Sequence, residues 1–153
     1  MVVKKMISYA QLGLLLIVLN LWGCKKAHEA VLTLKFADHY NIKSHFDVAR
    51  QELSVTLSLA PGFHAYASRE HVGKPLRLEV SPAGGWQARG ATLIPPGQLK
   101  NLDGLGLSDV LTGTINMSQK VIPGPQAGKA LLHMQICTDS QCDQPRIHEI
   151  SLP

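Results

Sequence analysis

The sequence predicts an all-β domain built as a two-sheet sandwich, and three observations lead to this fold class. Apolar residues alternate with polar residues in several short stretches, as in strands that bury one face. Clusters of turn-forming residues separate these stretches. The chain contains 13 Gly and 9 Pro, and after residue 30 no apolar stripe with a helical period is sustained. Short alternating strands separated by turns are typical of a sandwich.

The expected strands follow one another along the chain in four groups. Their alternating apolar residues are Leu53, Val55, Leu57 and Leu59, then Leu76, Leu78 and Val80, then Leu132, Met134 and Ile136, and finally Ile150 and Leu152. Turns rich in Pro and Gly are expected at 60–62, 81–85, 94–97 and 122–125. The segment from Gln98 to Asp109 is expected to be irregular, because its two glycines permit unusual backbone conformations. About 130 residues after the N-terminal segment suit a single domain.

The N-terminus has the features of a cleavable export signal. Lys4 and Lys5 precede an apolar stretch from Leu12 to Leu21, which is shorter than the about 20 residues that span a bilayer. The stretch ends in Leu-Trp-Gly-Cys at Cys24, which resembles the lipobox of bacterial lipoproteins, where the cysteine carries the lipid and begins the mature chain. Lys25 then implies sorting to the outer membrane, with the protein on its periplasmic face. An ordinary signal peptide and a retained anchor remain the alternatives.

This interpretation divides the chain into three parts. We expect a signal peptide over residues 1–23, a short tether over 24–29 and the folded domain over 30–153. The chain carries 15 basic and 11 acidic residues, and loss of Lys4 and Lys5 with the signal lowers its net charge from +4 to +2. No cluster of basic residues tracks a phosphate backbone, so nucleic acid is not an expected partner. We find no nucleophile elbow, phosphate loop or glycine fingerprint, and no cofactor is expected.

Cys137 and Cys142 are the best candidates for a site of chemistry. On a strand from Lys129 to Cys137, side chains alternate, so Cys137 is expected to leave the core side at the strand's end. The four polar residues between the cysteines and Pro145 behind them predict a hairpin loop. The Cα atoms across such a loop can reach the separation of about 4.4 to 6.8 Å that a disulfide needs. Export implies an oxidising compartment, in which this bond persists.

Three functions remain open for the cysteine pair on spacing alone. A structural disulfide that closes about six residues removes only about 2 kcal/mol of unfolded-state entropy. A redox pair is the second reading, because two neighbouring thiols can resolve a mixed disulfide within one protein. Zinc or copper(I) is the third, because thiolates and imidazoles are suitable ligands. The imidazoles in question are those of His64, His133 and His148.

Three segments of the chain carry a resemblance to a known family. They are Ala-Pro-Gly-Phe-His-Ala-Tyr at 60–66, Gly-Lys-Pro-Leu at 73–76, and Gln-Ile-Cys continuing through the second cysteine to a proline at 135–145. Together they resemble the N-terminal periplasmic domain of the thiol:disulfide interchange protein DsbD, the DsbD-N or disulfide-corrector family, from about Val31 to Leu152. The resemblance implies an immunoglobulin-like two-sheet sandwich whose cysteine pair, on a hairpin, passes electrons to periplasmic disulfide proteins.

The resemblance also implies roles for individual residues. Cys142 corresponds to the partner-facing sulfur and Cys137 to the resolving sulfur, although the flank at 143–145 departs from the Pro-Pro pattern of the family. His64 and Tyr66 align with aromatic positions beside the disulfide. An imidazolium at His64 would favour the thiolate form of a cysteine and lower its pKa. Alternatively, His64 is a structural residue at a strand edge and Tyr66 serves in packing.

In this family a loop with an aromatic cap shields the disulfide. The corresponding segment here runs from Asp103 to Asp109, and the capping position falls on Gly104. Leu105 or Leu107 is then the expected substitute for the aromatic side chain. The carboxylates of Asp103 and Asp109 are candidates to tune the pair; the alternative is that, like most carboxylates of surface loops, they have no specific role.

Two hypotheses from different classes follow. The first is a lipid-anchored thiol:disulfide exchange module that takes electrons from a thioredoxin-like or membrane donor. The membrane-embedded segment and the thioredoxin-like domain that often follow in the family are absent from this sequence, so the electrons are expected to come from another protein. The alternative is a noncatalytic immunoglobulin-like lipoprotein that binds a partner or a metal and uses the disulfide as a staple.

Overall fold

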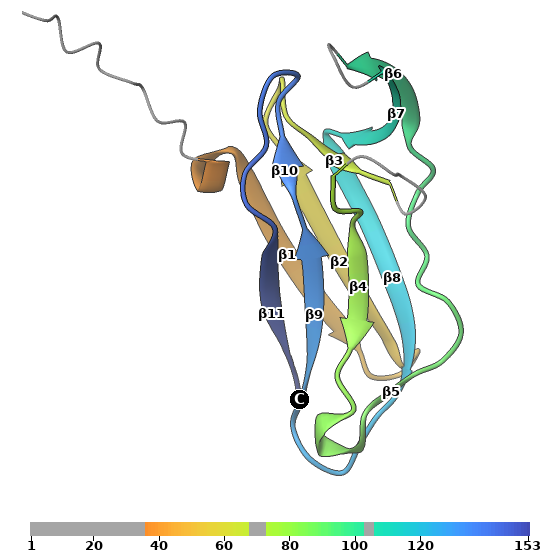
Figure 1. The fold of residues 1–153 in the computed structure, drawn as a ribbon. Helices are drawn as coiled ribbons and strands as arrows, with labels where there is room; N and C mark the ends of the chain where they lie inside the picture. The colour runs from red at the N-terminus through yellow and green to blue at the C-terminus, as the bar shows by residue number, and fades with distance from the viewer. Residues whose placement is uncertain (1–35, 68–72, 103–105) are drawn as a thin grey trace, which may run out of the picture. The chain divides into compact units, whose positions relative to one another are not determined.

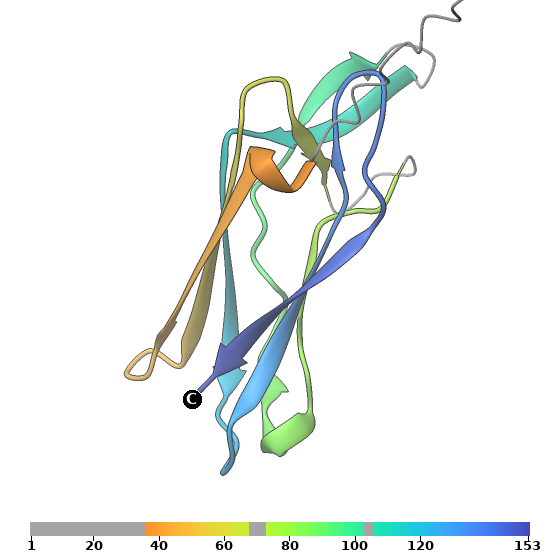
Figure 2. The same ribbon diagram turned by 90° about the vertical axis from the view of Figure 1, so that its left-hand side faces the viewer.

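Three antiparallel sheets form a sandwich in the computed structural model, which describes residues 36–67, 73–102 and 106–153 (Figure 1). One layer has the order β1-β2-β8-β5, with β1 Tyr40–Asp47, β2 Glu52–Leu59, β8 Thr114–Ile122 and β5 Gln87–Ala88. The facing layer has the order β11-β9-β4, with β11 Arg146–Leu152, β9 Gly128–Met134 and β4 Arg77–Val80. Figure 2 shows these two layers from the side.

A third sheet, of four strands, lies at one end of the sandwich (Figure 1). Its order is β10-β3-β7-β6, with β10 Ile136–Cys137, β3 His64–Tyr66, β7 Gly106–Thr112 and β6 Gln98–Leu102. The described helical segments are two short 3₁₀ turns, η1 Phe36–His39 and η2 Ala83–Gly85. Within the described ranges, no helix has the length and apolar character needed to cross a membrane. The predicted all-β class is confirmed.

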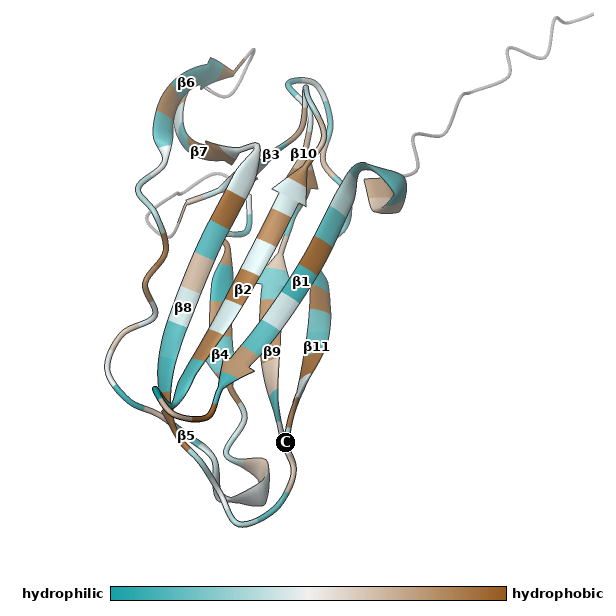
Figure 3. Cartoon of the chain, turned by 180° about the vertical axis from the view of Figure 1, so that it is seen from behind, coloured by the Kyte–Doolittle hydropathy of each residue, from teal (hydrophilic) through white to brown (hydrophobic). Residues whose placement is uncertain are grey.

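The alternating strands bury one face each, as predicted. In β2, Leu53, Val55 and Leu57 are at most 1 % exposed, and the register places Leu57 opposite Ile115 of β8. Figure 3 shows the resulting bands of apolar and polar residues along β1, β2 and β8. Burial of each such side chain contributes about 1.5 to 3 kcal/mol. The facing layer supplies the other half of the core: Leu78, Val80, Ala130, Leu132, Ile150 and Leu152.

The predicted strand from Lys129 to Cys137 changes sheet at Gln135. Its backbone pairs in the β11-β9-β4 layer up to Met134, and β10 then pairs with β3 of the third sheet. The Gln135 side chain stabilises this transition, because its Oε1 accepts the Lys74 N–H at 2.8 Å and its Nε2 donates to the carbonyl of Asp143 at 2.9 Å. The expectation that Cys137 leaves the core side is therefore wrong. Simple alternation fails at the change of sheet, and Cys137 is 0 % exposed.

The expectation of an irregular segment from Gln98 to Asp109 is also wrong. The strands β6 and β7 form an antiparallel pair across 98–102 and 106–110. Gly106 has φ of +80°, a conformation that glycine adopts without strain, at the start of β7. On the inner face of this pair, Leu102 and Val110 pack with Tyr66 and Cys137 in a second buried cluster. The β6–β7 pair thus covers the end of the sandwich where the cysteines lie.

Candidate functional site

Cys137 and Cys142 form a disulfide across the hairpin that follows β10, with Cα atoms 4.0 Å apart. The two residues face each other in an isolated antiparallel bridge. The flanking backbone hydrogen bonds run from Thr138 N–H to the Gln141 carbonyl at 2.8 Å and from Asp143 N–H to the Ile136 carbonyl at 2.9 Å. The cysteines therefore occupy a non-hydrogen-bonded pair, in which Cα atoms approach to about 4.5 Å. This register explains why their separation falls just below the predicted range.

The loop between the cysteines is held by its own side chains. Thr138 Oγ1 accepts hydrogen bonds from the N–H groups of Ser140 at 3.4 Å and Gln141 at 3.2 Å. Such local bonds between a hydroxyl and the backbone are typical of tight turns. The hairpin is therefore ordered by backbone and side-chain hydrogen bonds as well as by the disulfide.

The two sulfur-bearing residues differ sharply in exposure. Cys137 is 0 % exposed and packs with Tyr66, Leu102 and Val110. Cys142, on the outer side of the hairpin, is exposed. A reagent in solution therefore reaches Cys142 first, because Cys137 is buried.

Tyr66 lies against the exposed member of the pair. Its hydroxyl is 3.8 Å from Cys142 Sγ, while its ring is 1 % exposed and meets the His64 ring edge-on at a centroid distance of 5.4 Å. Gly73 leaves room for this ring, because a Cβ on that residue would overlap Cε2 of Tyr66. The Gly-Lys-Pro-Leu segment thus helps to position an aromatic side chain beside the disulfide.

His64 is directly opposite Cys137 in the β3–β10 register. The imidazole is 1 % exposed, and neither of its nitrogens has a hydrogen-bond partner. Its Nδ1 lies 3.8 Å from Oδ1 of Asp139 in the loop between the cysteines. Burial lowers the pKa of His64 below 6.5, Asp139 opposes this effect, and the positive charge of Lys100 adds to it. Burial therefore favours the neutral form of the imidazole.

An ion pair connects the β6–β7 pair to the cysteine loop. Lys100 Nζ donates to both carboxylate oxygens of Asp139, at 2.7 and 2.9 Å. This interaction lowers the pKa of Asp139. Sequence reasoning missed both residues, although the position of Asp139 between two cysteines was a usable signal. It also missed Ser108 of β7. In the part of the chain that the structure describes, the buried Oγ of Ser108 has no hydrogen-bond partner, and the same is true of the two nitrogens of His64.

The segment that follows Cys142, which departs from the family pattern, is held by hydrogen bonds to a charged side chain. Asp143 accepts hydrogen bonds from the Gln144 N–H at 2.9 Å and from Nε of Arg146 at 2.6 Å. The Arg146 interaction is the main reason why the pKa of Asp143 is lowered. A charged contact therefore orders this flank in place of a rigid Pro-Pro pair.

The predicted cap residues divide into two groups. Asp103 and Leu105 lie outside the described residues, as does the predicted lipidation residue Cys24. Leu107 is 70 % exposed on the outer face of β7, so the expectation that it can shield the disulfide is wrong. Leu102 and Val110 shield Cys137 instead. Asp109 is opposite Leu99 in the register and its carboxylate contacts Gly97, on the side of β7 away from Val110.

The three histidines considered as metal ligands do not come together. His133 lies on β9 beside Glu79 at 3.5 Å and Arg77 at 3.4 Å, and His148 is exposed on β11. Within 36–67, 73–102 and 106–153, no group of three or more His, Cys, Asp or Glu side chains is placed to hold a metal ion. The structure therefore offers no support for metal binding at the cysteines in these ranges.

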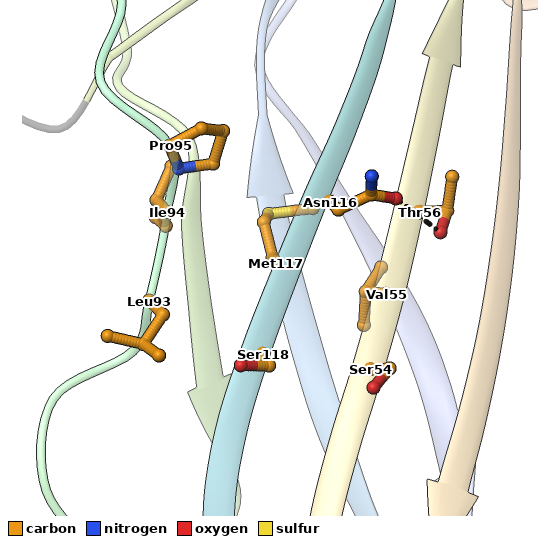
Figure 4. A pocket seen from close by; sticks show the side chains of 9 residues that line it. All are labelled: Ser54, Val55, Thr56, Leu93, Ile94, Pro95, Asn116, Met117 and Ser118. Carbon is orange, nitrogen blue, oxygen red and sulfur yellow. Dashed lines mark hydrogen bonds between the residues drawn. The ribbon is translucent and has the colours of Figure 1, made fainter.

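A groove of about 430 Å³ lies elsewhere, between the segment 93–95 and the strands β2 and β8 (Figure 4). Its polar lining residues are Ser54, Thr56, Asn116 and Ser118, and Thr56 donates a hydrogen bond to Asn116 at 2.9 Å. None of its lining residues is ionisable in the physiological range. The groove lacks the acid, base or activated nucleophile that a catalytic site needs, so the cysteine hairpin remains the candidate site.

The arrangement of the sheets matches that of solved domains. The fold is that of the N-terminal domain of DsbD. The reduced N-terminal domain of DsbD from Neisseria meningitidis superposes with a TM-score of 0.60 at 16 % identity, over 78 % of this chain and 89 % of that chain. The DsbD N-terminal domain from the complex with the PilB N-terminal domain of the same organism gives 0.59 at 15 % identity, over 78 % and 86 %.

A third similar structure is the N-terminal periplasmic domain of ScsB from Proteus mirabilis. Its TM-score is 0.49 at 15 % identity, and the match covers 79 % of this chain but 49 % of that one. No protein-family model and no curated protein sequence matches this chain. The two DsbD N-terminal domains, with TM-scores of 0.60 and 0.59, confirm the resemblance for the fold.

Proposed function

We propose that this protein is a periplasmic thiol:disulfide exchange module, lipid-anchored at Cys24, that passes electrons from a thioredoxin-like or membrane donor to periplasmic disulfide proteins. The observation that carries this proposal is the unequal exposure of Cys137 and Cys142 within one disulfide. Exchange requires an accessible sulfur that meets the partner and a second sulfur that resolves the mixed disulfide. The hairpin provides both.

The exchange proceeds in two steps. A partner thiolate attacks Cys142 Sγ, a bond forms between the two proteins, and the electron pair of the old disulfide leaves on the Cys137 sulfur. A second partner thiolate then attacks the partner sulfur of the mixed disulfide and releases Cys142. The partner is oxidised from dithiol to disulfide, and Cys137 and Cys142 become thiols. The reverse sequence passes the same two electrons to the next protein.

The fold neighbours support this interpretation. One DsbD N-terminal domain was solved in its reduced form, and another in complex with the PilB N-terminal domain. These observations concern those proteins; the present chain has the same fold and carries its own disulfide on the hairpin that follows β10. A partner that approaches the exposed Cys142 end is consistent with both.

The alternative, a structural staple, would contribute little to the stability of this hairpin. The disulfide closes a sequence separation of five residues, and a loop this short removes only about 2 kcal/mol of unfolded-state entropy. Backbone hydrogen bonds on both sides of the pair and the Asp143–Arg146 contact already order the hairpin. A bond that adds little stability at an accessible position is better explained by chemistry.

Trapping of mixed disulfides tests the proposal. Cys137→Ala leaves Cys142 able to bond to a partner but removes the resolving sulfur, so cross-linked species should accumulate in the periplasm and disappear on reduction. Cys142→Ala is the matched control and should trap few, because its remaining thiol is buried. Non-reducing gels and mass spectrometry of the adducts give the readout. Equal absence of adducts from both variants would contradict the exchange role.

The reduction potential separates the two hypotheses independently. Exchange-active disulfides lie at about −120 to −270 mV, whereas structural ones lie below about −300 mV. Equilibration of the purified protein with glutathione or dithiothreitol buffers should place this pair in the first range. A value below about −300 mV would leave the disulfide as a staple.

A further inference from the structure

His64 is a buried polar side chain that the fold leaves without partners. Both ring nitrogens are unpaired although the residue is 1 % exposed. Buried polar groups in native proteins are nearly always hydrogen-bonded, and an exception needs an explanation. Packing alone does not provide one, since an aromatic hydrocarbon would fill the same space without unpaired nitrogens.

The position of His64 suggests the explanation. It is the direct cross-strand neighbour of Cys137, and side chains of such a pair have Cβ atoms about 4.5 to 5.5 Å apart on the same face of the sheet. The imidazole is therefore beside the sulfur that departs when a partner attacks Cys142. That sulfur is enclosed by Tyr66, Leu102 and Val110, so a bare thiolate formed there would lack solvation.

We propose that His64 carries the proton to and from the Cys137 sulfur during exchange. This inference rests on the exchange function proposed above. When the partner thiolate bonds to Cys142, the Cys137–Cys142 bond breaks, and the electron pair left on Cys137 is protonated by the imidazolium of His64. In the reverse direction neutral His64 removes the proton from the Cys137 thiol, and the resulting thiolate attacks Cys142 in the mixed disulfide and expels the partner thiolate.

A route connects His64 to solvent. Asp139, whose side chain is 55 % exposed and thus in contact with bulk water, lies 3.8 Å from Nδ1. A pocket of about 180 Å³, lined in part by His64, Lys100 and Thr112, also opens beside the ring and is large enough for water. The proton released when the partner thiol ionises can therefore reach the imidazole, and from there the Cys137 sulfur.

The groups that face His64 come from every neighbouring element. They are Tyr66 on its own strand, Cys137 on β10, Thr112 on β7, Lys100 on β6 and Asp139 in the hairpin loop. Burial and Lys100 lower the pKa of His64, and Asp139 raises it. Burial therefore favours the neutral ring, which accepts the proton, and Asp139 favours the imidazolium, which donates it. Two protons and two electrons enter the cysteine pair in a full reduction, one proton through His64 and one at exposed Cys142.

Chemical rescue tests the proposal. The purified full chain is reduced with dithiothreitol over about pH 5 to 8, and the rate is expressed per concentration of the reagent's thiolate. His64→Ala should slow reduction by about 10-fold or more, within the range of general acid–base contributions. Free imidazole should restore the rate, because the space left by the ring adjoins the existing pocket. His64→Gln should be slowed without rescue, because its amide occupies that space.

His133→Gln is the matched control, a histidine on β9 outside the site, and should leave the rate and its pH profile unchanged. Slow reduction of His64→Ala with an unchanged pH profile and no rescue would show a packing role and overturn the proposal. A wild-type rate profile in His64→Gln would overturn it even if His64→Ala fails to fold. Resistance of the wild-type disulfide to dithiothreitol would instead refute the exchange function itself.

Discussion

Gly73→Ala tests whether close packing against Gly73 holds Tyr66 beside Cys142. Gly73 has φ of +75°, and a Cβ there would overlap the Tyr66 ring. The left-handed backbone costs an alanine about 1 to 2 kcal/mol. The ring is 1 % exposed and cannot swing into solvent, so overpacking adds about 1 to 3 kcal/mol. The free energy of unfolding in urea, measured with the disulfide intact, should fall by about 2 to 5 kcal/mol.

Gly62→Ala is the matched control. Gly62 has φ of +84°, but its added Cβ would meet no atom within 4 Å, so only the backbone cost of about 1 to 2 kcal/mol applies. A second check uses Tyr66→Ala as the background, where Gly73→Ala should cost no more than Gly62→Ala does, because the ring is gone. Equal destabilisation by Gly73→Ala and Gly62→Ala in the wild-type background would refute the reasoning.

Three further predictions concern pH, shielding and location. The pKa of His64 is lowered in the folded protein, so the unfolded chain binds the His64 proton more tightly. The free energy of unfolding therefore has its full value above about pH 6.5 and decreases as the pH falls toward the folded-state pKa. His64→Gln should remove this slope in urea unfolding between about pH 7 and 5. Leu102→Ala should lower the free energy of unfolding by about 2 to 5 kcal/mol and speed reduction of the disulfide several-fold in a thiol-quench assay. An unchanged rate of reduction would show that Leu102 does not shield Cys137. Cys24→Ser should release the protein from the membrane or stall its processing, as seen by fractionation and mass, whereas unchanged membrane binding at the same mass would contradict the lipobox.

The fold was predictable where apolar residues occupy a single face. In β2 every second residue from Leu53 is buried, and the period of two identifies the strand directly. The β6–β7 pair lacks this signal. Leu99 and Leu107 are 76 % and 70 % exposed on the outer face, while Leu102 is buried on the inner one. Apolar side chains on both faces hide the alternation, and the glycines suggested a loop.

The site was predictable only in part. The two cysteines stand out in the sequence, and the family resemblance directed attention to His64 and Tyr66. The Lys100–Asp139 pair spans 39 residues, and it forms only because β6–β7 folds over the hairpin. Local patterns carry no information on such a contact. The burial of Cys137 was missed for a related reason, since it depends on the change of sheet after Met134.

The change of sheet at Gln135 separates the stable part of the molecule from its reactive part. The two facing layers hold most of the main apolar core, and the first of them contains β1, β2 and β8, which have eight or nine residues. The sheet that carries the disulfide contains strands of two and three residues, β10 and β3, and the unpartnered atoms of His64 and Ser108. Local opening requires only that the contacts of a small element be broken. The Cys137 sulfur can therefore be uncovered by displacement of Leu102 and Val110 and loss of the Lys100–Asp139 contact, while Leu111 of β7 stays in the core between the two layers.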